Sequence, residues 1–253
     1  MTEALSNRVA FVTGARRGIG RAVALGLAHE GASVVLVARS GDELDQVAEA
    51  VRSLGSAALA VTADIGKPAP VATAIDQARA RFTTVDVLIN NAAVVWPLGP
   101  TSLMSPDDRA AAMAINVTGA VRLTIGLLPA MVERGWGRIV NVSSGIAAHP
   151  AAMIGANAYA ATKAALEAHT LNLAAEINGG GVTVNVFRPG TVDTTMHAWI
   201  RGQPPETIGS VLHSRFTRAY EQGTPISPEQ SAQTLLEKLP SAQTGEIWSV
   251  TAE

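Results

Sequence analysis

Residues 8–20 read RVAFVTGARRGIG, a short apolar run that leads directly into a glycine-rich turn and then into a helical pattern. Glycines at Gly14, Gly18 and Gly20 permit a tight turn, a close approach of the backbone to a ligand, and close packing of a helix on a strand. The first amide groups of such a helix have no partner within the helix and carry partial positive charge, which suits a pyrophosphate. A purely structural turn is the alternative for three glycines in isolation. Their place between a strand and a helix favours dinucleotide binding.

The rest of the chain alternates short apolar runs with alanine-rich helical stretches. The runs are rich in valine and isoleucine without strict alternation, which suits strands covered on both faces. The predicted strands are residues 8–13, 33–37, 57–62, 85–90, 138–142, 182–187 and 246–250. The predicted helices are residues 18–30, 41–54, 68–81, 106–133, 158–177 and 228–238. This order predicts an α/β fold with a Rossmann-type, doubly wound parallel sheet of about seven strands and helices on both faces.

No linker, repeat or break in composition divides the chain, so a single domain over residues 1–253 is predicted. Serines before two proline-containing helix starts, Ser105 and Ser227, are predicted N-caps. Residues 191–226 contain three prolines, several glycines and scattered aromatic residues, and are the least regular stretch. A long irregular segment in a compact fold is usually a lid or a binding loop, so this segment is predicted to cover the substrate.

The composition excludes several classes of function. The formal net charge is -2, so no basic field attracts nucleic acid or anionic lipid. Cysteine is absent and none of the five histidines forms a ligand-like pair, so no metal site is expected. Charged residues make up 16% of the chain, below the roughly 25% of a typical soluble domain, which favours a homo-oligomer such as a dimer or tetramer. Without a signal-peptide core or a long apolar run, the expected location is the cytoplasm, with no membrane partner.

The second predicted strand ends in Val-Ala-Arg-Ser, and no acidic residue follows before Asp42. A carboxylate at this position usually holds the ribose hydroxyls of NAD. Arg39 and Ser40 stand there instead, and Arg39 together with Arg16 or Arg17 is suited to a 2′-phosphate. The alternative is that these arginines are simply solvated. The pattern favours NADP(H) over NAD(H).

One of the two tyrosines of the chain is followed by a lysine four residues later. On a helix, Tyr159 and Lys163 share a face. A cation about 4 Å from a phenol is expected to lower its pKa by roughly three units from 10, before burial opposes the effect. The expected result is a phenol able to act as a general acid and base near neutral pH.

Two serines follow the predicted strand 138–142, at the edge of the sheet that also carries the glycine turn. The hydroxyl of Ser144 is placed to donate a hydrogen bond to a substrate carbonyl. Ser143 is the alternative donor if the intervening loop shifts the register, and a strand-ending serine in a structural turn is the other alternative.

These motifs, taken together, resemble the short-chain dehydrogenase/reductase family, and the resemblance covers nearly the whole chain. The matching segments are TGARRGIG at 13–20, Asp64-Ile65, NNAA at 90–93, Asn116, NVSS at 141–144, YAATK at 159–163 and RPGTVDT at 188–194. The resemblance implies that Tyr159 is the acid–base, that Ser144 positions the substrate oxygen, and that Lys163 binds the nicotinamide ribose. Asn116 would hold a water of the proton relay, although a structural amide is the alternative there.

The same resemblance assigns the cofactor site. Asp64 and Ile65 would flank the adenine, and Pro189, Gly190 and Thr191 would lie at the nicotinamide. The full set of implied cofactor residues is Gly14, Arg16, Arg17, Gly18, Ile19, Gly20, Arg39, Ser40, Asp64, Ile65, Asn91, Ala92, Tyr159, Lys163, Pro189, Gly190, Thr191, Val192 and Thr194. For Asn90 and Asn91 a structural role is again the alternative.

The implied activity is that of a carbonyl reductase or alcohol dehydrogenase acting on a small, largely apolar substrate. A cofactor-binding redox sensor without turnover is the alternative, and such a protein would be expected to have lost Tyr159 or Lys163.

Three features depart from the family pattern. Ser144 and Tyr159 are separated by fifteen positions (159 minus 144), Ala93 replaces a glycine, and the tail 249–253 lacks a glycine pair. We therefore expect an enlarged loop beside the site.

Overall fold

Seven parallel strands form one sheet in the order β3-β2-β1-β4-β5-β6-β7. The strands are β1 (Val9–Thr13), β2 (Ser33–Ala38), β3 (Ala58–Thr62), β4 (Val87–Asn90), β5 (Gly137–Val142), β6 (Val182–Arg188) and β7 (Ile247–Ser249). The computed structural model describes residues 5–250, so the last residues of the atypical tail, 251–253, lie outside the described residues. Strand order and bounds confirm the predicted doubly wound fold.

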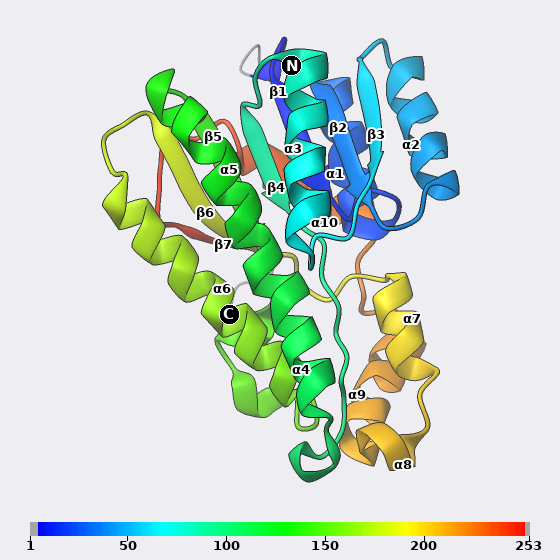
Figure 1. Ribbon diagram of the computed structural model, residues 1–253. Coiled ribbons are helices and arrows are strands. Elements are labelled where there is room, and N and C mark those ends of the chain that lie inside the picture. The colour runs from blue at the N-terminus through cyan, green and yellow to red at the C-terminus, as the bar shows by residue number, and fades with distance from the viewer. Residues whose placement is uncertain (1–4, 251–253) are drawn as a thin grey trace.

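Helices cover both faces of this sheet (Figure 1). On one face lie α1 (Gly18–His29), α2 (Asp42–Ser53) and α10 (Pro228–Lys238), whose buried residues join one core cluster with the sheet. On the other face lie α3 (Pro68–Phe82), α5 (Ala120–Glu133) and α6 (Asn157–Glu176), which pack on a second cluster. Because the strands are covered on both sides, they are apolar throughout rather than alternating.

The helical stretch predicted over 106–133 is confirmed with the same bounds, but it contains a π-helical segment. It consists of α4 (Pro106–Met113), the π-helical segment η3 (Ala114–Gly119) and α5. Ser105 caps α4 as predicted, because its hydroxyl accepts from the Asp108 amide. The stretch Pro106–Glu133 has the length and hydropathy of a membrane-crossing helix, with 39% of its apolar window buried, and it packs against α3, α6 and β5.

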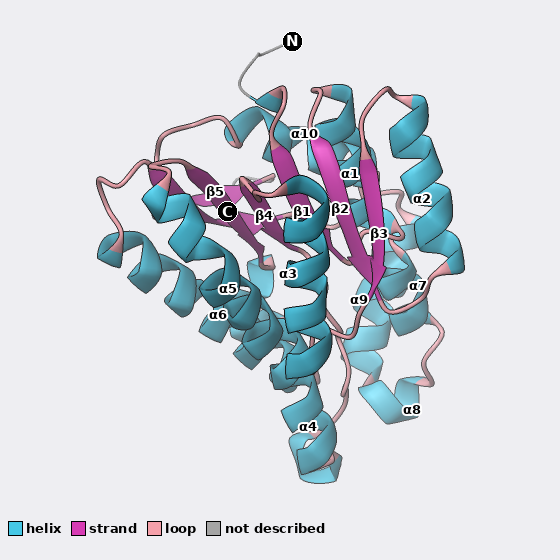
Figure 2. Ribbon diagram, turned by 45° about the horizontal axis from the view of Figure 1, so that its top comes forward, coloured by secondary structure: helices cyan, strands magenta, loops and turns pink. Residues whose placement is uncertain are grey.

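Residues 191–226 are mostly helical, contrary to the irregular segment predicted. They form α7 (Thr195–Arg201), α8 (Pro205–Ile208) and α9 (Ser210–Glu221). These helices lie together beyond one end of the sheet (Figure 2). Their buried residues Ile200, Leu212 and Phe216 pack with Ile146 and Tyr159 in a third cluster, so the segment is anchored by its own apolar core.

Candidate active site

A cavity of about 830 Å³ lies at the carboxyl ends of the strands, between the glycine turn and the α7–α9 segment. Every residue assigned from the sequence lines it except Gly20 and Asn116. Its apolar wall is formed by Val94, Val95, Trp96, Ile146, Met153, Met196, Trp199, Ile200 and Phe216. The cavity joins the glycine turn to Tyr159 in one continuous space, as the carboxyl-end rule for open α/β sheets predicts.

The glycine turn is shaped by close contacts within the protein. Gly14 and Gly18 have φ values of 66° and 55°, in the left-handed region that favours glycine. A Cβ at Gly20 would lie 2.3 Å from the Gly14 carbonyl oxygen, and one at Gly14 would lie 2.8 Å from Nδ2 of Asn91. Asn91 Nδ2 donates to the Thr13 carbonyl at 2.9 Å and to the Gly14 carbonyl at 3.4 Å, so this amide ties the end of β4 to the turn. Gly20 is therefore needed for the close packing of the turn, and it does not line the cavity.

The amino end of α1 faces this cavity with its amide groups free of a side-chain cap. Arg17 is the N-cap residue and makes no capping hydrogen bond with the described residues, and no acidic residue occupies the first turn. Unpaired amide groups at the amino end of a twelve-residue helix attract an anion through their donors and the helix dipole.

Three arginines gather beside the same turn. Burial lowers the pKa of Arg17, and the positive charges of Arg16 and Arg39 lower it further, while Glu43 opposes them. The Arg16 guanidinium donates to the Glu43 carboxylate. Arg39 and Ser40 follow β2 and line the cavity as predicted. The local excess of cations is suited to an additional phosphate.

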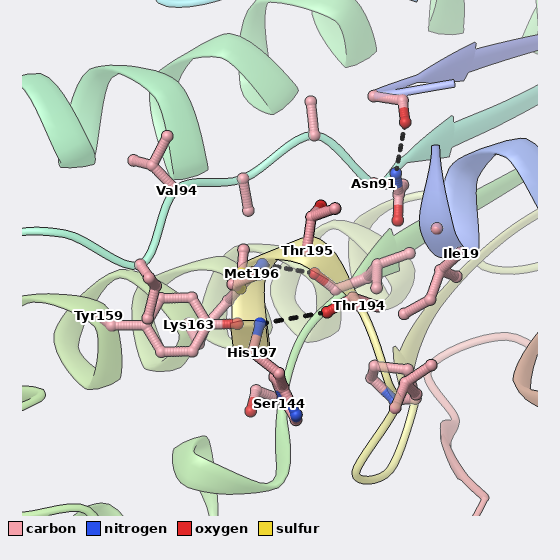
Figure 3. Close-up of a pocket in the computed structure, with 18 of the residues that line it drawn as sticks. Ile19, Asn91, Val94, Ser144, Tyr159, Lys163, Thr194, Thr195, Met196 and His197 are labelled. Atoms are coloured by element: carbon pink, nitrogen blue, oxygen red, sulfur yellow. Dashed lines mark hydrogen bonds between the residues drawn. The ribbon is translucent and has the colours of Figure 1, made fainter. Parts of the chain in front are cut away.

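Tyr159 and Lys163 project from α6 into the far end of the cavity, opposite Ser144 and the start of α7 (Figure 3). Both side chains are buried, with Tyr159 8% and Lys163 2% exposed. Lys163 Nζ donates to the Val142 carbonyl at 2.7 Å and lies 5.6 Å from the centroid of the Tyr159 ring. The ammonium is thus held at the end of β5, close to the phenol.

The prediction that Lys163 lowers the pKa of Tyr159 is wrong. Burial raises this pKa to about 12, although a hydrogen bond with Ser144 opposes the rise. Burial also lowers the pKa of Lys163 to about 8, while the charge of Glu167 opposes that change. Loss of hydration is the largest cause of both changes. Tyr159 consequently holds its proton at neutral pH.

The loop between Ser144 and Tyr159 forms two 3-10 turns, η4 (Gly145–Ala147) and η5 (Pro150–Ala152), which take up the longer spacing. Ser144 is the N-cap of η4 and accepts from the Ile146 amide at 3.4 Å. Its hydroxyl is the one paired with Tyr159. The Ser143 hydroxyl is buried and has no hydrogen-bond partner among the described residues. The geometry favours Ser144 over Ser143.

Asn116 lies in η3 and supports the cavity wall from behind. Its Nδ2 donates to the Val94 carbonyl at 2.7 Å and to Thr162 Oγ1 at 3.0 Å, and its Oδ1 accepts from the Val94 amide at 2.8 Å. The amide is therefore used for structure, as the alternative interpretation expects, and the water-holding role stays a prediction. Ala93, which replaces the expected glycine, lines the cavity.

Several residues of the site were not predicted. His197 of α7 lines the cavity, and burial followed by the charge of Arg201 lowers its pKa to about 4. Its ring meets Phe216 edge-on at 4.8 Å. No motif marks this histidine in a segment predicted to be irregular. Glu167 was also missed, although its spacing of four residues from Lys163 places it on the same helical face.

Comparisons with known proteins agree with this geometry. A model of the short chain dehydrogenase family matches residues 8–204. Oxidoreductase UcpA of Escherichia coli (strain K12) is 40% identical over 209 residues, covering 82% of this chain and 78% of that protein. The structure of L-sorbose reductase from Gluconobacter frateurii, complexed with NADPH and L-sorbose, has a TM-score of 0.87 and 28% identity, with 99% of this chain and 97% of that chain covered. The 3-ketoacyl-(acyl-carrier-protein) reductase from Brucella melitensis, complexed with NADH, has a TM-score of 0.83 and 30% identity, with 97% of each chain covered.

Proposed function

The chain belongs to the short-chain dehydrogenase family, and from that premise we propose that it is an NADP(H)-dependent carbonyl reductase or alcohol dehydrogenase with Tyr159 as its general acid and base. The observation that carries this proposal is the continuous cavity between the uncapped start of α1 and the Tyr159–Ser144 pair. A dinucleotide needs a phosphate-binding end and a reactive end in one space. We also propose that residues 1–253 act as one catalytic unit, with 191–226 covering the substrate.

The residues present fit a nicotinamide dinucleotide. The amide groups of α1 suit the pyrophosphate, and the arginines at the end of β2 and in the glycine turn suit a 2′-phosphate. The adenine would lie near Asp64 and Ile65, and the nicotinamide near Pro189, Gly190 and Thr191, all of which line the cavity. When bound, the cofactor supplies or accepts the hydride.

The protein's own contribution is to orient the substrate oxygen and to move a proton. Ser144 Oγ donates a hydrogen bond to that oxygen, and the Tyr159 hydroxyl donates its proton as negative charge develops there. A pKa of about 12 keeps Tyr159 protonated before reduction begins. The Lys163 ammonium, fixed by Val142 at 2.7 Å, favours the phenolate that remains. In the oxidative direction the same groups act in reverse.

The substrate is proposed to be a small, largely apolar ketone or secondary alcohol. The wall around Tyr159 includes Met153, Met196, Trp199 and Phe216. His197 holds no charge near neutral pH because its pKa is lowered to about 4. An apolar wall with a neutral imidazole disfavours a highly charged group beside the reacting carbon.

A panel of carbonyl compounds, followed by nicotinamide absorbance with NADPH and NADH in parallel, tests the proposal. We expect turnover of apolar ketones and a preference for NADPH. The Arg39→Ala variant should raise the KM for NADPH by about 10- to 100-fold, the loss of charged hydrogen bonds to a phosphate. Its KM for NADH should change little, since NADH lacks that phosphate.

Arg52→Ala is the matched control for Arg39→Ala. Arg52 is an exposed arginine on α2 that pairs with Glu49 three residues earlier, and its removal should alter neither KM. An equal rise in the KM for NADPH and the KM for NADH in Arg39→Ala would contradict the assignment of NADP(H) as cofactor. A preference of the wild type for NADH would also contradict it.

A second copy of the chain is the proposed partner of the outer faces of α5 and α6. Ile125 and Val132 of α5 are 66% and 47% exposed, and Leu171 of α6 is 37% exposed. The two helices lie side by side in both views of the molecule (Figures 1 and 2). Exposed apolar residues on neighbouring helices are typical of contacts between subunits.

A cytoplasmic location of the protein stays a prediction.

Light scattering after size-exclusion chromatography tests this oligomer. We expect the wild type to be a dimer or tetramer and Ile125→Glu to dissociate, because the interface would bury an unpaired carboxylate. Leu103→Glu is the control, since Leu103 is 83% exposed in the turn η2 (Thr101–Leu103), which lies outside α5 and α6. A monomeric wild type would contradict the proposal.

A further inference from the structure

A buried ion pair lies one helical turn beyond Lys163. Glu167 is 7% and Arg188 is 8% exposed. Arg188 donates from Nε to one Glu167 carboxylate oxygen at 3.0 Å and from Nη2 to the other at 2.9 Å. Two parallel hydrogen bonds of this kind fix the orientation of the carboxylate. The pair joins α6 to the end of β6.

Both members of the pair are next to parts of the site. Glu167 follows Lys163 by four residues on α6, so the two side chains share a face. Arg188 lines the cavity and directly precedes Pro189 and Gly190. Glu167 is therefore one helical turn from the buried ammonium, and its partner Arg188 adjoins the turn assigned to the nicotinamide.

We propose that Glu167, oriented by Arg188, is a positioning residue that keeps Lys163 cationic within the cavity wall. This inference rests on the proposed function, because Glu167 acts through Lys163 and not on the substrate. A buried ammonium loses its proton readily unless an anion is near. Arg188 holds the Glu167 carboxylate, while Lys163 Nζ donates to the Val142 carbonyl.

Lys163 shares the cavity with several titratable groups. Tyr159 and Glu167 stand four residues before and after it on α6, and Arg188 of β6 and His197 of α7 line the same cavity. His149 and Arg215 also line it. The end of β5 and η3 present backbone and neutral side chains there. Tyr159 and His197 are uncharged near neutral pH, because burial raises the first pKa and lowers the second. Glu167 is thus the anion that can stabilise the ammonium.

Direct titration of Lys163 tests the inference without turnover. The chain has three lysines, Lys67, Lys163 and Lys238, so ¹³C labelling of lysine Cε gives three NMR signals, and Lys163→Met assigns the buried one. The test variant is Glu167→Gln with Arg188→Met, which removes both charges at similar volume and leaves no buried guanidinium without its carboxylate. We expect the Lys163 midpoint to fall relative to the wild type, because the charge of Glu167 raises the pKa of Lys163. The fall should be smaller than for loss of the carboxylate alone, since the Arg188 charge is removed with it.

Two controls separate this effect from a structural one. Glu167→Asp keeps the charge and should hold the Lys163 midpoint closer to the wild-type value than the neutral pair does. Asp86→Asn removes a buried carboxylate that accepts from the Val9 amide at 2.9 Å and pairs with Arg134 at 3.4 Å, just before β4 at the opposite end of the sheet. It should leave the Lys163 midpoint unchanged. An unchanged midpoint in the folded neutral-pair variant overturns the inference.

The pH profile of kcat gives the functional readout. In the wild type we expect carbonyl reduction to decline as pH rises through the Lys163 midpoint, and in the neutral-pair variant this decline should begin at lower pH. A role confined to joining α6 and β6 would lower kcat without moving the profile, which would count against the inference. Failure of the wild type to turn over any carbonyl would instead refute the proposed function, while the NMR titration would still decide whether Glu167 holds the charge of Lys163.

Discussion

Tyr159→Phe is expected to lower kcat for carbonyl reduction by about 10²- to 10⁴-fold, the contribution of a positioned general acid. The variant loses one hydroxyl, while its ring still packs with Ile146 and Phe216. Affinity for NADPH should change much less than kcat, because Tyr159 is one of many residues assigned to the cofactor and most of the others lie elsewhere along the cavity. Steady-state kinetics and a cofactor-binding titration measure the two quantities separately.

The chain provides its own control for this substitution. Tyr220 is the other tyrosine, and it is 52% exposed on α9 beneath the Arg201 guanidinium. Tyr220→Phe should retain wild-type kcat. Full activity of Tyr159→Phe would show that another group donates the proton. A wild type that binds NADPH and turns over no carbonyl would favour the redox-sensor alternative.

Lys163→Met is expected to lower kcat by about 10²-fold or more, as for the removal of a preorganised group that stabilises developing charge.

Lys163→Met should also raise the free energy of unfolding by about 1–2 kcal/mol near pH 7. An apolar chain replaces a buried cation, and this gain exceeds the cost of leaving the Val142 carbonyl without its donor. Urea unfolding followed by fluorescence checks the stability, and Lys238→Met, an exposed lysine of α10, is the control.

The stabilisation by Lys163→Met should depend on pH. Burial lowers the folded-state pKa of Lys163 from 10.5 to about 8. Below pH 8 both the folded and the unfolded chain carry the proton, so the full cost of burying the cation is present. Between about pH 8 and 10.5 the unfolded chain binds more protons, and wild-type stability gains relative to the variant. The difference between the two proteins should therefore shrink as pH rises through this window, and a constant difference would contradict the lowered pKa.

The strands and the helices on the sheet were predictable because each carries its apolar pattern over its whole length. Residues 33–37 form β2, and 68–81 form α3 within one residue. The cavity was predictable for a related reason, since parallel strands bring all their carboxyl ends to one edge. Residues distant in sequence, such as Arg39, Asn91 and Pro189, meet there.

The α7–α9 segment was not predictable from the same signal. Periodicity is read over windows of about 11–18 residues, whereas α7 has seven residues and α8 has four. Their core contacts are widely spaced, and the glycine at 209 breaks the pattern with a φ of 92°. The π-helical segment η3 was also hidden, because a local change in helical hydrogen bonding leaves the apolar spacing nearly intact.

The direction of the Tyr159 pKa shift could not be derived from spacing. A separation of four residues places Lys163 beside the phenol, but burial decides whether the attraction or the loss of hydration is larger. Burial is a property of the packed cavity wall, where Tyr159 is 8% exposed. The side-chain amide of Asn116 is similar, since its bonds to Val94 depend on how η3 packs.

The packing of Gly20 against Gly14 bears on how the family's sequences diverge. No part of Gly20 borders the cavity, yet a side chain there would lie 2.3 Å from the Gly14 carbonyl oxygen. A descendant that lost its cofactor but kept its fold would still be selected to retain this glycine. In a search for new dehydrogenases, the third glycine of the pattern therefore indicates that a sequence has inherited the strand-to-helix turn. Arg39 and Tyr159 are the positions that can change once cofactor binding or turnover is lost.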